Sequence, residues 1–210
     1  IKILVKETGV DEFKTLVMRE WGQIKNGPLT VTEQEIRRCK DYFIDPSYEK
    51  LLDAPDTLTT ELNKNVLFKS WYDQNVSSHK KPGYSIVTIC FKETGIAPGD
   101  ISDVQLNRVA DLADEYSFSE VRVTHHQNIV LANVKQSDLP SLWHKLNEAS
   151  LSTANLGLLT DMICCPGGDF CALANAKSLP IAESIQRQFP NEKILREIGA
   201  LRINISGCMN

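Results

Sequence analysis

The sequence of 210 residues has no long apolar run and no excess of basic residues. A membrane-spanning helix needs about 20 predominantly apolar residues, and no stretch here approaches that length. The 23 lysines and arginines are outnumbered by 27 aspartates and glutamates, so the formal net charge is -4. Proteins that bind nucleic acids usually carry a basic surface. We therefore expect neither a nucleic acid nor a membrane as a partner.

Signals for export and for nucleotide binding are also missing. The N-terminus, IKILVKETGVDEF, has neither the apolar length nor the cleavage pattern of a signal peptide. We therefore expect a cytoplasmic protein, in which the six cysteines stay reduced and do not form disulfides. No glycine-rich nucleotide-binding loop occurs, so a redox reaction here would need electrons from another protein or domain.

The first part of the chain, residues 1–78, is predicted to be an N-terminal strand followed by a helical linking segment. IKILV is typical of a short strand. Apolar residues then recur at helical spacing between Phe13 and Ile24. A further helix is predicted to begin after Thr32, and another over residues 61–74.

The middle part, residues 79–150, follows the order β-α-β-β-α. YSIVTICF is rich in β-branched residues, and Ser102 is placed to cap the next helix. EVRVT and NIVLANV read as two strands joined by the short HHQ turn, and SDLPSLWHKLNEAS reads as a helix. This order predicts an α+β fold with a ferredoxin-like half-domain.

The last part, residues 151–210, contains DMICCPGGDFC and ends with NISGCMN. The gaps between Cys164, Cys165 and Cys171 do not fit the usual spacing of a zinc site, and there is no C-x-x-C redox pair. A disulfide is disfavoured by the expected compartment. An iron–sulfur cluster remains open, since Cys165 and Cys171 are far enough apart for a loop to wrap one corner of it.

Glycines next to the cysteines favour the cluster hypothesis. Gly167 and Gly168 allow the backbone to curl and to direct N–H groups at sulfur. Gly207 allows a similarly close approach beside Cys208. The C-x5-C spacing is not specific by itself, so the four explanations stay open at this point.

Three segments together resemble the siroheme-containing nitrite and sulfite reductases, most closely the bacterial assimilatory type: CCPGGDFCALANAK, LRINISGCMN and VRVTHHQNIVLANV. The resemblance implies that residues 79–150 are that family's ferredoxin-like half-domain. It also implies that residues 151–210 are the N-terminal part of a mixed α/β domain that binds a 4Fe-4S cluster and siroheme.

The resemblance implies metal ligands as well. In this family a C-x5-C pair and a later C-x3-C pair bind the cluster, and Cys165, Cys171 and Cys208 match three of the four positions. Cys164 has no counterpart, and we expect it to be a small buried residue behind the loop. The fourth cysteine would fall two residues beyond Asn210. Because there is also no initiator methionine, we expect a fragment that is inactive alone and purified without siroheme or an intact cluster.

The siroheme carboxylates would need cationic and hydrogen-bonding partners. The RVTHHQN segment offers them, so the predicted cofactor-binding residues are Arg122, Thr124, Gln127, Asn128 and Asn210. The two turn histidines, His125 and His126, are interpreted as solvated residues because the family's haem has a cysteine as its proximal ligand.

The resemblance predicts six-electron reduction of nitrite to ammonia or of sulfite to sulfide by the parent protein. Either anion fits, and the electron donor would be a ferredoxin or a flavoprotein. Two other classes stay open: a cofactor-free scaffold of the same fold, and a haem-free iron–sulfur electron carrier. The carrier would have no use for the polar RVTHHQN side chains.

Overall fold

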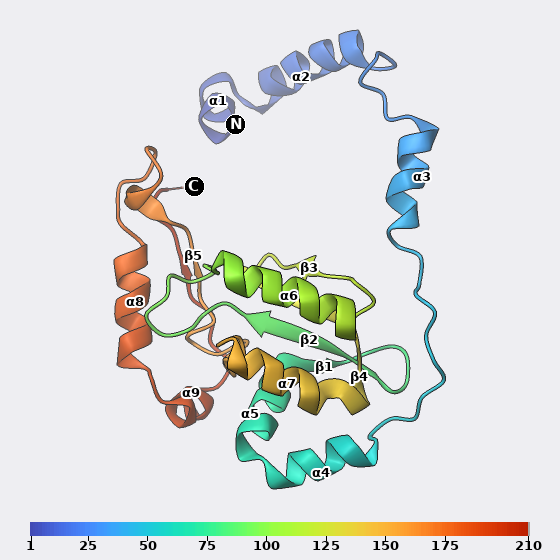
Figure 1. The fold of residues 1–210 in the computed structure, drawn as a ribbon. Helices are drawn as coiled ribbons and strands as arrows, with labels where there is room; N and C mark the ends of the chain where they lie inside the picture. Colours follow the sequence, from blue (N-terminus) through green and yellow to red (C-terminus); the bar gives the residue numbers. More distant parts are fainter. Residues whose placement is uncertain (210) are drawn as a thin grey trace. The chain divides into compact units, whose positions relative to one another are not determined.

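The computed structural model describes residues 1–209 and divides into two compact units (Figure 1). The first unit, Ile1–Ser47, contains helices α1 (Lys2–Thr8), α2 (Val10–Ile24) and α3 (Glu33–Asp41). The Thr32 side chain accepts a hydrogen bond from the Glu35 N–H (3.2 Å) and caps α3, at the predicted helix start. No residue of these three helices is buried.

The prediction of a strand over residues 1–5 is wrong, because residues 2–5 belong to helix α1 and Ile1 is its N-cap. The Val5 N–H donates to the Ile1 carbonyl, and the Gly9 N–H to the Val5 carbonyl, both at 2.9 Å. Gly9 has a φ of 82°, which ends α1 before α2 begins. An apolar pentapeptide is compatible with either structure, and an isolated strand without a neighbour leaves its backbone groups unpaired.

The second unit begins at Tyr48 and is built on a four-stranded antiparallel sheet of order β1-β2-β4-β3. The strands are β1 (Val76–Ser78), β2 (Tyr84–Cys90), β3 (Arg122–Val123) and β4 (Asn128–Lys135). Helix α6 (Asp103–Tyr116) lies between β2 and β3 in the chain. After β4 come the 3-10 turn η1 (Gln136–Asp138) and α7 (Leu139–Glu148). The predicted β-α-β-β-α order is thus confirmed, with the Ser102 capping box in place.

Helices cover one face of this sheet and form the main core (Figure 1). Val87 and Ile89 of β2 pack there against Leu112 of α6 and Leu142 of α7, all fully buried. Two further helices, α4 (Asp56–Lys64) and α5 (Val66–Asn75), add side chains such as Phe68. They were predicted as one helix but separate at Asn65, whose side chain accepts the Phe68 N–H (3.0 Å) and caps α5.

The last part of the chain adds a small two-stranded parallel sheet, β5 (Ile163–Cys164) with β6 (Asn204–Ile205). Between these strands lie η2 (Gly167–Asp169), α8 (Leu179–Gln188) and α9 (Glu192–Ile198). Met162, Cys164 and Ala182 form a small buried cluster, against which Ile205 of β6 packs. The fold is therefore α+β, as predicted. Across residues 1–209, none of the helices combines the length and apolar character that crossing a bilayer requires.

Candidate functional site

The face of β2 and β4 opposite the helices carries polar side chains and borders a cavity of about 220 Å³. Because successive residues of a strand point to opposite faces, Thr88 and Cys90 alternate with the core residues Val87 and Ile89. β5 and β6 supply the other wall. The cavity is lined by Thr88, Thr124, His126, Asn128, Leu156, Gly157, Asp161, Ile163, Arg202 and Asn204.

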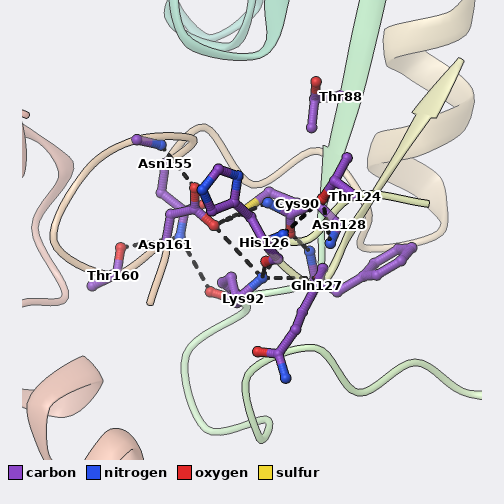
Figure 2. Close-up of polar contacts among 12 residues, drawn as sticks. Thr88, Cys90, Lys92, Thr124, His126, Gln127, Asn128, Asn155, Thr160 and Asp161 are labelled. Carbon is purple, nitrogen blue, oxygen red and sulfur yellow. Dashed lines mark hydrogen bonds and ion pairs between the residues drawn. The ribbon is translucent and has the colours of Figure 1, made fainter. Parts of the chain in front are cut away.

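A buried lysine lies beside this cavity. The Lys92 side chain is fully buried, and its Nζ donates to the backbone carbonyls of His126 and Gln127, both at 2.9 Å. It also donates to Asn128 Oδ1 at 2.7 Å, and Asp161 Oδ1 lies 3.6 Å away (Figure 2). Burial lowers the pKa of Lys92 because it disfavours the charged form, and Asp161 opposes that fall.

Asp161 joins three separate segments of the chain. Its Oδ1 accepts hydrogen bonds from Asn128 Nδ2 (3.0 Å) and from the Cys90 thiol (3.3 Å). Its Oδ2 accepts the Gly157 N–H at 2.9 Å. Burial and the carboxylate together raise the pKa of Cys90 well above the usual thiol range, so this thiol is a neutral donor. The network therefore fixes the segment just before β5 against the sheet.

Thr124 organises the turn between β3 and β4. Its Oγ1 accepts the N–H groups of His126 and Asn128, each at 3.2 Å. The Thr124 N–H donates to the Asn128 carbonyl (2.9 Å), which closes the predicted hairpin. Of the predicted cofactor-binding residues, Thr124 and Asn128 line the cavity.

Gln127 is directed toward the cysteine segment. Its backbone carbonyl contacts Lys92, whereas its side chain extends away from that network (Figure 2). Nε2 donates to the Cys164 carbonyl (2.9 Å), and Oε1 accepts the Cys164 N–H (3.0 Å). One side-chain amide thus pairs with both backbone groups of Cys164, as a neighbouring strand would. Cys164 itself is buried, as expected.

The loops that carry Cys165 and Cys208 meet at two glycines. The Gly207 N–H donates to Cys165 Sγ at 3.1 Å. A Cβ on Gly207 would lie 2.7 Å from the Gly167 Cα and 2.6 Å from the Ala176 carbonyl oxygen, so a side chain has no room there. The hydrogen bond from Gly207, with a smaller contribution from the Ser178 hydroxyl, lowers the pKa of Cys165. An N–H group is thus directed at Cys165 Sγ, but it comes from Gly207, whereas the Gly168 N–H donates to the Ala176 carbonyl (2.9 Å).

The other two predicted metal ligands are more open. Cys171 is exposed, and its N–H donates to the Gly167 carbonyl (2.9 Å). Cys208 is half-buried, with its Sγ 3.7 Å from Ser206 Oγ. Within residues 1–209, no three or more His, Cys, Asp or Glu side chains are grouped closely enough to hold a metal ion.

Two predicted residues stand apart from this arrangement. Arg122 is exposed, pairs with Glu120 and does not line the cavity. Asn210 lies outside the described residues.

Several site residues were missed from the sequence. Lys92 and Asp161 are far apart in the chain, and nothing in CFKETG or TDMIC marks them as a buried pair. Arg202 and His126 also border the cavity. Burial first, and then the nearby His125 and Arg202, lower the pKa of His126. The one available signal was the spacing of Cys90 and Lys92. They lie two residues apart at the end of a clear strand, so their side chains are expected on the same face.

Comparison with known proteins agrees with this architecture. The family model described as "Nitrite/Sulfite reductase ferredoxin-like half domain" matches residues 79–149. The chain is 30% identical over 156 residues to the chloroplastic ferredoxin–nitrite reductase of Zea mays, covering 70% of this chain and 26% of that protein. It is 27% identical over 123 residues to sulfite reductase [ferredoxin] 2 of Mycolicibacterium paratuberculosis, covering 55% and 22%.

A solved structure extends the likeness over the fold. The structure of Mycobacterium tuberculosis NirA protein aligns with 99% of this chain and 32% of its own, with a TM-score of 0.52 and 21% identity. The chain spans about a quarter of the length of the first curated relatives it matches. From these matches we conclude that residues 79–149 form a nitrite/sulfite reductase ferredoxin-like half-domain, and that the chain is similar to nitrite reductases over 70% of its length.

Proposed function

We propose that this chain forms the part of a nitrite or sulfite reductase that binds a 4Fe-4S cluster, with Cys165, Cys171 and Cys208 as ligands. The observation that carries the proposal is the hydrogen bond from the Gly207 N–H to Cys165 Sγ. It brings the loop that follows β5 into contact with the loop that follows β6, so cysteines from two distant segments lie on neighbouring loops.

The chemistry of these residues suits such a cluster. An iron–sulfur cluster is held by thiolates, and N–H groups directed at sulfur tune its reduction potential. Cys165 has its pKa lowered by an N–H group of this kind. The crowding around Gly167 and Gly207 favours the same conclusion, since any side chain there would push the two loops apart.

We further propose that the polar segment from β3 through the turn to the start of β4 lies on the siroheme side of the site, with Arg122, Thr124, Gln127 and Asn128 as its residues. Thr124 fits a direct contact, since it borders the cavity and its hydroxyl proton is free to be donated. The polar atoms of Gln127 and Asn128 are engaged inside the protein, so these two residues would orient the turn. When bound, siroheme would supply the iron at which the anion is reduced.

The substrate and donor follow from the relatives. Ferredoxin–nitrite reductases and a ferredoxin sulfite reductase are among the proteins similar to this chain, so nitrite or sulfite is the proposed substrate. Reduction of either anion to ammonia or sulfide consumes six electrons and several protons. We propose a ferredoxin or a flavoprotein as the electron donor.

The test is turnover by the protein produced from its complete coding sequence, expressed together with siroheme synthesis. Ammonium or sulfide is measured after nitrite or sulfite is added with a chemical reductant. We expect turnover in the wild type and in Cys39→Ser, whose exposed thiol lies in α3, and none in Cys165→Ser. Equal turnover in the two serine variants would overturn the assignment of Cys165.

A further inference from the structure

We infer that Lys92 is a positioning residue for the cysteine-bearing segment. Its buried ammonium group fixes the turn at His126 and Gln127, and the Gln127 side chain in turn fixes the Cys164 peptide beside Cys165. The role of this positioning in holding a cluster rests on the proposed function, but the contacts themselves are present without any cofactor.

The first step is the fit of the ammonium group to the turn. A lysine ammonium has three N–H donors and no acceptor. All three are used, by two consecutive backbone carbonyls and by Asn128 Oδ1, at 2.7 to 2.9 Å. Carbonyl dipoles that converge on one point repel each other unless a cation lies between them. The charge of Lys92 is therefore what allows the His126 and Gln127 carbonyls to face the same atom.

The second step is the unusual conformation of Gln127. Its φ is 58°, in the left-handed region that residues with a side chain rarely adopt. Such a conformation persists where surrounding contacts enforce it. Here the Lys92 contact holds the carbonyl, and Gly99 leaves space for the side chain. A Cβ on Gly99 would lie 2.9 Å from the Gln127 Cβ.

The third step is the contact through which the position of Gln127 fixes strand β5. One edge of this short strand pairs with β6, through the Ile163 N–H to the Ile203 carbonyl (2.9 Å) and the Cys165 N–H to the Ile205 carbonyl (3.1 Å). The other edge, at Cys164, pairs with the Gln127 side chain. Lys92 therefore reaches the Cys164 peptide through the Gln127 side chain, apart from its ion pair with Asp161 just before β5. The Cys164 N–H reports on the route through Gln127.

The test is amide hydrogen exchange in the full chain without cofactor, comparing Lys92→Met with the wild type. Methionine keeps most of the length and volume of the side chain and removes the charge. We expect protection of the Cys164 N–H to fall by about tenfold or more, the effect of losing a hydrogen bond to a charged group. Protection of the Ile163 and Cys165 N–H groups should fall much less. Lys145→Met, which breaks an exposed pair with Glu115, is the control and should change none of the three.

Two further variants separate positioning from general stability. In Lys92→Met/Asp161→Asn the unpaired carboxylate is also removed, so folding should recover while Cys164 protection stays low. In a Gln127→Ala background, Lys92→Met should have no additional effect on Cys164. An equal loss at all three amides, or recovery of Cys164 protection in the double variant, would overturn the inference. Since no readout involves a cofactor, the result does not depend on whether the chain binds a cluster.

Discussion

Asp161 and Lys92 form a buried ion pair whose polar atoms are almost all used. The side chains are 7% and 0% exposed, and each contacts at least three other groups. A buried pair of this kind adds little net stability compared with an apolar pair, but removal of one partner leaves an uncompensated charge. The residues around it are therefore sensitive to substitution even though none of them is a predicted metal ligand.

Replacement of Asp161 tests this sensitivity. We expect Asp161→Ala to lower the free energy of unfolding by about 3–5 kcal/mol, because Lys92 loses its counter-charge in a buried site. The control is Asp73→Ala, which removes an exposed pair with Lys69 and should cost less than about 1 kcal/mol. The measurement is urea unfolding of both variants. Similar losses in the two would contradict the buried-pair account.

Cys165 provides a second test at the residue scale. Its pKa is lowered in the folded chain, so alkylation in the cofactor-free chain should reach half its maximal rate at a lower pH than in the urea-unfolded chain. The resulting dependence of stability on pH has a definite sign. The thiolate stabilises the folded state above the ordinary thiol pKa, and this contribution fades as the pH falls through the lowered value. Coincident alkylation profiles, followed at Cys165 by mass spectrometry, would refute the effect of the Gly207 hydrogen bond.

At the scale of elements, the short sheet β5–β6 depends on the close contact of its two following loops. Gly207→Ala would place a methyl group 2.6 Å from a backbone oxygen, and backbone cannot move aside easily. We expect a loss of about 1–3 kcal/mol in the free energy of unfolding. Gly168→Ala, in the facing loop after β5, meets nothing closer than 3.5 Å and should be tolerated. If thermal unfolding shows the same stability for both variants, the loops do not meet as described.

The elements also show what the sequence can predict. The β-α-β-β-α order was predictable because strand alternation, the Ser102 cap and the HHQ turn are local signals that agree. The helix at Lys2–Thr8 was not, because five apolar and charged residues do not reveal whether a neighbouring strand exists. The predicted boundaries at residues 78 and 150 stay predictions.

The candidate site was predictable to a smaller extent. Cysteine and glycine spacing, with the family resemblance, pointed to the cysteine loops and to the turn after β3. These signals did not reveal that the Gln127 side chain pairs with the Cys164 backbone or that Lys92 lies beneath the turn. Those contacts depend on tertiary packing of distant segments, which one sequence does not encode in any local pattern.

For the whole molecule, the central claim is that the loops of Cys165, Cys171 and Cys208 bind a cluster in a siroheme-containing reductase. The most direct measurement is an anaerobic UV–visible spectrum of the protein produced from the complete coding sequence with siroheme synthesis. The account predicts siroheme bands together with a broad iron–sulfur shoulder, and loss of the shoulder in Cys165→Ser but not in Cys39→Ser. A folded protein without either absorption, or a shoulder unchanged by Cys165→Ser, would contradict it.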